Sequence, residues 1–173
     1  MPESYRPHFP SDDHKEKTHS QSLESNSAVG NARIADVLGK KGNAVITIRP
    51  QETLGRAVEI LRDRNVGALL VTDANGAIQG ILSERDIVRK LAETPGRTLP
   101  HEVAAVMTEK VITCTGDDLV ETVTKRMSDG RFRHMPVVDH GRLVGLVSIG
   151  DLVNYRLVQL EYEALKLKQL IVG

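Results

Sequence analysis

Two stretches with the same pattern decide the fold: VGALLVTDANGAIQGILSERDIV at residues 66–88 and FRHMPVVDHGRLVGLVSIGDLV at residues 132–153. Each contains an aliphatic strand, a short polar turn, a second aliphatic strand and a Ser-x-x-Asp followed by two aliphatic residues. The Asp-Ala-Asn-Gly turn at residues 73–76 predicts a hairpin because Asn and Gly accept positive φ, and His140 and Gly141 occupy the matching turn. Both stretches therefore predict a β-hairpin followed by a helix.

The similarity extends upstream of both hairpins. A β-branched strand is predicted at 45–48 and again at 111–114, each followed by an amphipathic helix. Asp117 and Asp118 are suitable N-terminal caps for the second of these helices. Helical spacing of apolar residues is shown by Leu54, Ala57, Val58 and Leu61 in the first copy and by Val120, Val123 and Met127 in the second. The chain therefore contains two copies of a β-α-β-β-α unit.

This repeat predicts an α/β (α+β) fold in which two units pack with approximate twofold symmetry, because neither unit is large enough to bury its own sheet and helices well. We expect a flexible N-terminal arm at 1–31, which is polar and has little to bury. Repeat 1 is expected at 32–93, a linker at 94–102, repeat 2 at 103–156 and a C-terminal helix at 157–173.

Composition excludes several classes of protein. The 173 residues include 23 basic and 23 acidic side chains, so no overall field attracts nucleic acid or an anionic membrane, and any anion site must be local. Aromatic residues make up 3% of the chain with no Trp, which predicts an aliphatic core. One cysteine, a polar N-terminus and short apolar runs predict a cytoplasmic protein without disulfides or membrane spans.

The two stretches, their hairpin glycines and the preceding strand-helix units resemble the cystathionine-beta-synthase (CBS) domain family over about residues 33–155. The resemblance implies a tandem pair of domains with a cleft between them, in which adenosine-containing ligands bind. It implies AMP as the first candidate ligand, with ADP, ATP, NAD(H) or S-adenosylmethionine as others. Most relatives carry a CBS pair as an appendage, whereas this chain leaves no room for a catalytic domain, so we expect a stand-alone regulatory module without catalytic activity.

The two Ser-x-x-Asp motifs, Ser83 with Asp86 and Ser148 with Asp151, have two compatible interpretations. A serine followed three residues later by a carboxylate is close to a helix capping box. A carboxylate also accepts hydrogen bonds from both hydroxyls of a ribose diol, and a helix N-terminus attracts phosphate. The family resemblance implies that Asp86 and Asp151 bind ribose, and we expect nucleotide contact at one or both motifs.

Candidate phosphate ligands are concentrated in GRFRHM at 130–135. The resemblance implies that Arg133 and His134 reach phosphate, and Arg131 is a further candidate. Because neighbours in a strand point to opposite faces, only one of Arg133 and His134 is expected to line the cleft. Arg85 is a candidate in repeat 1, where repeat 2 has Gly150, and an exposed first-turn arginine is its alternative interpretation.

Adenine contacts are expected at the end of each first strand, largely through backbone and apolar surface, as the resemblance implies. Cys114 is expected to be a buried small hydrophobe rather than a nucleophile. Gly80 and Gly145 are explained by close ligand approach or by strand packing. The expected adenine residues are Thr47, Ile48, Arg49, Thr113, Cys114, Thr115, Met135 and Pro136.

The C-terminal stretch carries apolar residues at alternating spacings of four and three: Val153, Leu157, Leu160, Ala164, Leu167 and Ile171. This heptad pattern packs either against the chain's own core or against a second copy, and we favour a homodimer. The arm histidines His8, His14 and His19 are irregularly spaced, and no metal site is predicted.

Three functions compete. The first is a ligand-sensing module that signals to an unidentified regulated protein when a nucleotide shifts its conformational population. The second is an enzyme using Asp86 and Asp151 as paired carboxylates with Cys114 or His134 assisting, but the similar environments of the carboxylates do not separate two pKa values. The third is a scaffolding or nucleic-acid-binding protein, which balanced charge and scarce aromatics disfavour.

Overall fold

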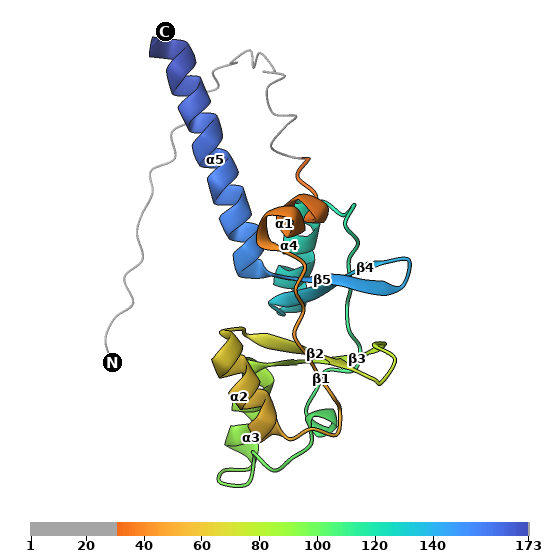
Figure 1. Cartoon of the computed structure of the whole chain (residues 1–173). Helices are drawn as coiled ribbons and strands as arrows, with labels where there is room; N and C mark the ends of the chain where they lie inside the picture. The colour runs from red at the N-terminus through yellow and green to blue at the C-terminus, as the bar shows by residue number, and fades with distance from the viewer. Residues whose placement is uncertain (1–30, 173) are drawn as a thin grey trace, which may run out of the picture.

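The computed structural model describes residues 31–172, so the predicted N-terminal arm and its histidines His8, His14 and His19 lie outside the described residues. The elements in chain order are α1 (Ile34–Lys41), β1 (Thr47–Ile48), α2 (Leu54–Arg64), β2 (Ala68–Thr72), β3 (Ile78–Ser83), α3 (Glu84–Glu93), the 3-10 helix η2 (Val103–Ala105), α4 (Val120–Gly130), β4 (His134–Asp139), β5 (Arg142–Ser148) and α5 (Ile149–Val172). The predicted mixture of helices and small sheets is confirmed, and the two hairpin units lie one above the other (Figure 1).

The first unit is a three-stranded sheet in the order β1-β2-β3, with α2 and α3 beside it. β1 runs parallel to β2, and β3 returns antiparallel with Val71 opposite Gly80. The predicted strand at 45–48 is only two residues long here. The core of the first unit consists of aliphatic side chains that the helical and strand periodicities bring to one side. Among them are Leu54, Ala57, Leu61, Leu69, Val71, Leu82 and Ile87.

The second unit repeats this plan with one strand fewer. β4 and β5 form an antiparallel hairpin with Val137 opposite Gly145. The prediction of a strand at 111–114 is wrong, because this segment contacts the second sheet only through an isolated bridge between Cys114 and Val137. The Thr113 carbonyl accepts instead from the Arg126 guanidinium at 2.9 Å, which satisfies a backbone group without a neighbouring strand.

Each unit receives the segment that precedes the other. Helix α1 contributes Ile34 and Leu38 to the core of the second unit, whereas Val103 lies in the core of the first. Equivalent backbone bonds hold the two segments in place, from Ile34 N to Asp118 O at 3.0 Å and from Val103 N to Glu52 O at 2.8 Å. The units are therefore interlocked along the chain.

The hairpin glycines Gly80 and Gly145 serve this interlocking. A Cβ atom at Gly145 would lie 2.8 Å from the Leu38 side chain on α1, and one at Gly80 would lie 2.7 Å from the Met107 sulfur. Close packing of the exchanged segments therefore explains both glycines, and the alternative of close ligand approach is not needed.

Two local predictions about turns and caps need correction. Gly76 has φ 82°, but Asn75 has no positive φ, because the Asp73 carboxylate accepts from the Asn75 backbone N–H at 2.9 Å and holds the turn. Neither Asp117 nor Asp118 caps α4: its N-cap is Leu119, and the Asp118 carboxylate accepts instead from the Thr115 backbone N–H.

The last helix, α5, is 24 residues long and packs against α1 and α4 only near its start. Its C-terminal half projects away from both units (Figure 1). Across residues 31–172, no helix combines the length and the apolar character needed to span a membrane.

Candidate functional site

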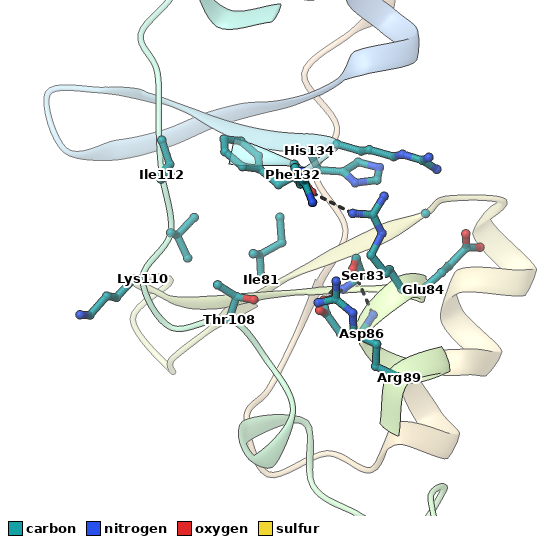
Figure 2. Close-up of a pocket in the computed structure, with 15 residues that line it drawn as sticks. Ile81, Ser83, Glu84, Asp86, Arg89, Thr108, Lys110, Ile112, Phe132 and His134 are labelled. Atoms are coloured by element: carbon teal, nitrogen blue, oxygen red, sulfur yellow. Dashed lines mark hydrogen bonds between the residues drawn. The ribbon is translucent and has the colours of Figure 1, made fainter. Parts of the chain in front are cut away.

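A cavity of about 300 Å³ opens between the two units (Figure 2). The first unit forms one wall with the start of α3, and the second forms the opposite wall with the end of α4 and the start of β4. The segment joining the units closes a third side. The lining residues are Gly67, Ile81, Ser83, Glu84, Arg85, Asp86, Arg89, Thr108, Lys110, Val111, Ile112, Arg131, Phe132, Arg133 and His134.

Ser83 and Asp86 form the α3 wall of this cavity. The Ser83 backbone N–H donates to Asp86 Oδ2 at 2.8 Å, and the Ser83 hydroxyl donates to the same oxygen at 2.6 Å. The capping-box interpretation is therefore confirmed for this motif. Within residues 31–172 Asp86 takes part in no ion pair, and it lines the cavity, where its carboxylate oxygens can accept from a hydroxyl donor.

The opposite wall consists of the basic stretch after α4. Arg131 ends this helix in the left-handed conformation, with φ 56°, and its carbonyl accepts from the Arg85 guanidinium at 2.8 Å (Figure 2). Arg133 and His134 both line the cavity, which corrects the expectation that only one would. The reason is that β4 begins only at His134, so Arg133 lies in a bend where the strand alternation does not apply.

His134 is an uncharged member of this wall at neutral pH. Burial lowers the pKa of its imidazole, and the nearby Lys41 ammonium lowers it further, while the carboxylates of Asp151 and Glu84 act in the opposite direction. Its ring packs over Gly67, where a Cβ atom would lie 3.3 Å from the imidazole. A phosphate group in the cavity would therefore meet positive charge mainly from arginines.

Five cationic side chains and two carboxylates line the cavity, so its charge balance favours the binding of an anion. Sequence analysis missed two of the cations, Arg89 and Lys110. Arg89 follows Arg85 by four residues on α3, and this helical spacing would have placed both on the same side. The apolar lining was also missed and comes from Ile81, Val111, Ile112 and Phe132.

None of the eight residues expected to contact adenine lines this cavity. Ile48 is buried in the first unit, and Cys114 and Met135 are buried in the second. Burial raises the pKa of the Cys114 thiol to about 11, so it stays protonated, as expected for a structural cysteine. The remaining five, Thr47, Arg49, Thr113, Thr115 and Pro136, also lie outside the lining.

Ser148 and Asp151 form the second copy of the motif away from this cavity. The Ser148 backbone N–H donates to Asp151 Oδ2 at 2.8 Å, and the Asp151 N–H donates to the Ser148 hydroxyl at 3.1 Å, which repeats the cap. Asp151 additionally forms an ion pair with Lys41 at the end of α1. Burial acts to raise the pKa of Asp151, but hydrogen bonds from Lys41 and Ser148 outweigh it, and the pKa lies below its ordinary value.

Comparisons with known proteins agree with this architecture. Residues 35–93 and 103–158 each match the family model described as CBS domain. The chain is 35% identical over 129 residues to the mitochondrial CBS domain-containing protein CBSX3 of Arabidopsis thaliana, covering 70% of this chain and 63% of that protein. The chain thus spans less than two thirds of the length of this curated relative.

Two solved structures are also similar. The CBS-domain containing protein ATU1752 from Agrobacterium tumefaciens superposes with a TM-score of 0.71 at 38% identity, covering 72% of this chain and 99% of that one. The CBS domain pair of protein MJ0100, solved in complex with 5′-methylthioadenosine and S-adenosyl-L-methionine, has a TM-score of 0.63 at 29% identity and covers 72% and 94%. With two matched segments that make up most of the sequence, the chain belongs to the CBS domain family as a tandem pair.

Proposed function

We propose that the protein is a non-catalytic, ligand-sensing module that binds an adenosine-containing nucleotide between its two CBS repeats. The observation that carries this proposal is the cavity between the repeats, which has a capped carboxylate on one wall and a basic stretch on the other. The occupied form would then signal to a regulated protein through a change in conformation or assembly. A cytoplasmic location, inferred from the sequence, belongs to the same proposal.

The chemistry of each wall fits one part of such a ligand. Asp86 accepts hydrogen bonds from the two ribose hydroxyls, as a charged carboxylate at a helix start is suited to do. Arg131 and Arg133 bind phosphate from the opposite wall. The apolar side chains of Val111, Ile112 and Phe132 offer a surface on which a purine packs.

The size of the cavity favours AMP among the adenosine ligands. A cavity of about 300 Å³ lies at the small end of the range for small-molecule sites. A single phosphate can reach the arginines while the base remains on the apolar side. The second and third phosphates of ATP, or the nicotinamide half of NAD(H), would extend beyond this volume into solvent. The two adenosine-containing ligands of protein MJ0100 support the same class of ligand.

A catalytic alternative is weakened by the positions of its candidate groups. Asp86 lines the cavity, whereas Asp151 is paired with Lys41 elsewhere, so the two carboxylates do not converge on one reacting atom. Cys114 is buried in the second core as a protonated thiol. His134 lines the cavity with Asp86, but Asp151 and Cys114 lie elsewhere, so the groups of the enzyme hypothesis do not converge and the proposal assigns no catalysis.

Isothermal titration calorimetry of the full chain with AMP, ADP, ATP, NAD(H) and S-adenosylmethionine tests the proposal, with GMP as a control for the base. We expect AMP to bind with a dissociation constant on the order of micromolar and to raise the melting temperature, because a ligand selective for the folded state stabilises it. Absence of heat and of stabilisation with all five ligands at millimolar concentration would overturn it. Salt-sensitive binding of an oligonucleotide that AMP does not compete would favour the nucleic-acid alternative instead.

A further inference from the structure

The projecting part of α5 exposes a row of large apolar side chains. From Ala164 to Ile171 every residue is exposed, and the exposed fraction reaches 59% at Leu167 and 84% at Ile171. With 24 residues, the helix is about 36 Å long, and only its start packs on the rest of the molecule. An apolar helix of this length standing free in water indicates a missing partner surface (Figure 1).

The order of apolar and charged residues along α5 specifies what that partner is. Leu157, Leu160, Ala164, Leu167 and Ile171 alternate at spacings of three and four, as the a and d positions of a coiled coil do. On this assignment Arg156 and Glu163 occupy g positions, while Glu161 and Lys168 occupy e positions. In a parallel pair, each g residue faces the e residue five positions later on the other helix.

The charges across such a parallel pair are complementary. Arg156 of one copy would face Glu161 of the second, and Glu163 would face Lys168, and both pairs occur twice because of the twofold symmetry. An antiparallel pair with the same apolar residues in contact would bring Glu163 to Glu163 and Glu161 to Glu161 of the two copies. The pattern therefore favours the parallel arrangement over the antiparallel one.

We propose that α5 forms a parallel, two-stranded coiled coil with α5 of a second copy of this chain, with Leu157, Leu160, Ala164, Leu167 and Ile171 in its seam. Charge complementarity identifies the partner as a second copy of this chain, because the same sequence supplies both members of each oppositely charged pair. No residue of this seam lines the nucleotide cavity, and the contact does not depend on the proposed ligand. The two pairs of CBS repeats would then stand side by side at the same end of the coiled coil.

Light scattering after size-exclusion chromatography of the full chain tests the seam. We expect the unaltered chain to be a dimer at micromolar concentration and Leu167→Glu to be a monomer. Leu165→Glu is the matched control, because Leu165 is 60% exposed, close to Leu167, but lies outside the seam. Equal circular dichroism of both variants checks that the helix still forms. A monomeric unaltered chain, or equal behaviour of the two variants, would overturn the proposal.

Charge exchange tests the direction of the pair. Glu163→Lys and Lys168→Glu should each weaken the dimer by about fivefold, because each places like charges opposite one another twice. The double variant restores opposite charges and should return the dissociation constant to its original value. Lys166→Glu changes the charge of α5 outside the seam and is the control. A double variant no tighter than the single ones would exclude the parallel register.

Discussion

The two Ser-x-x-Asp motifs have the same local structure and different surroundings. Both serines and aspartates form the same helix cap, with 2.8 Å from the serine N–H to the carboxylate. Asp86 then faces a cavity, whereas Asp151 is neutralised by Lys41. The Ser-x-x-Asp motif thus forms the same helix cap in both repeats, but only the first copy lines the cavity.

The difference originates in the segments exchanged between the units. Lys41 and Lys110 occupy equivalent positions, seven residues after the equivalent core residues Ile34 and Val103. Lys41 is the last residue of a continuous helix of eight residues, which carries the lysine onto Asp151. Before Lys110 only a three-residue 3-10 helix forms.

The chain after that short helix is extended and bonded to β3. Thr108 and Ile81 exchange backbone hydrogen bonds of 2.9 and 3.0 Å, which draws the chain along the sheet edge. Lys110 then points away from Asp86 (Figure 2). The length of the helix in the exchanged segment therefore determines whether its lysine forms an ion pair with the aspartate of the Ser-x-x-Asp motif.

Replacing each aspartate by alanine gives the largest expected contrast. Asp86→Ala should lower AMP affinity by about 10- to 100-fold, because a hydrogen bond to a charged group contributes about 1.5–3 kcal/mol. Asp151→Ala should leave AMP affinity within about twofold. Both variants lose a helix cap worth about 1 kcal/mol, and Asp151→Ala also loses the ion pair with Lys41, so the melting temperatures are measured first and calorimetry then isolates binding. An equal loss of AMP affinity in both variants would show that the two Ser-x-x-Asp motifs are equivalent half-sites for the ligand.

The basic wall can be separated from the ribose contact. Arg133→Ala should weaken AMP about tenfold and leave adenosine, which lacks phosphate, unchanged. Arg142→Ala removes an exposed arginine of the same unit that lies outside the cavity, and both ligands should bind it normally. Competition of each ligand against a fluorescent AMP analogue measures the four affinities. An equal loss for adenosine in Arg133→Ala would argue against a phosphate contact.

The fold could be predicted from sequence because its signals are local and repeated. The turn glycines Gly76 and Gly141, the aliphatic hairpin strands and the two Ser-x-x-Asp caps all act within a few residues, and the structure follows them. The pairing of Asp151 with Lys41 joins residues 110 positions apart, and no local pattern reports it. Six of the eight adenine residues were expected at the ends of the first strands, but the cavity is lined instead by Thr108, Lys110, Val111 and Ile112 of the segment that bridges to β3.

Releasing Asp151 should make the half-sites more alike. Lys41→Met removes the ammonium that occupies the carboxylate, and we expect calorimetry to show a second, weaker AMP binding event. The loss of stability should be about 1 kcal/mol or less, because the pair is partly exposed. Lys40→Met is the control, since Lys40 lies over the Tyr155 ring at 4.6 Å and not on Asp151. A single binding event in both variants would mean that more than Lys41 distinguishes the half-sites.

His134 connects the two half-sites and should give the smallest effect. It lines the cavity beside Glu84 and Arg133, and the charges of Lys41 and Asp151 also act on it. Because its folded pKa lies below the ordinary value of 6.5, the unfolded chain takes up the proton first as the pH falls. Stability from neutral His134 is therefore present above pH 6.5 and is lost as the pH falls through the folded pKa.

Between pH 7.5 and 5.0, the melting temperature of the unaltered chain should fall by roughly 2 °C more than that of His134→Gln. His101→Gln, outside the cavity, should behave like the unaltered chain. In a Lys41→Met background the difference should shrink, because removing the ammonium lets the His134 pKa rise toward its ordinary value. An unchanged difference there would mean that burial alone, and not the lysine of the second half-site, keeps this imidazole neutral.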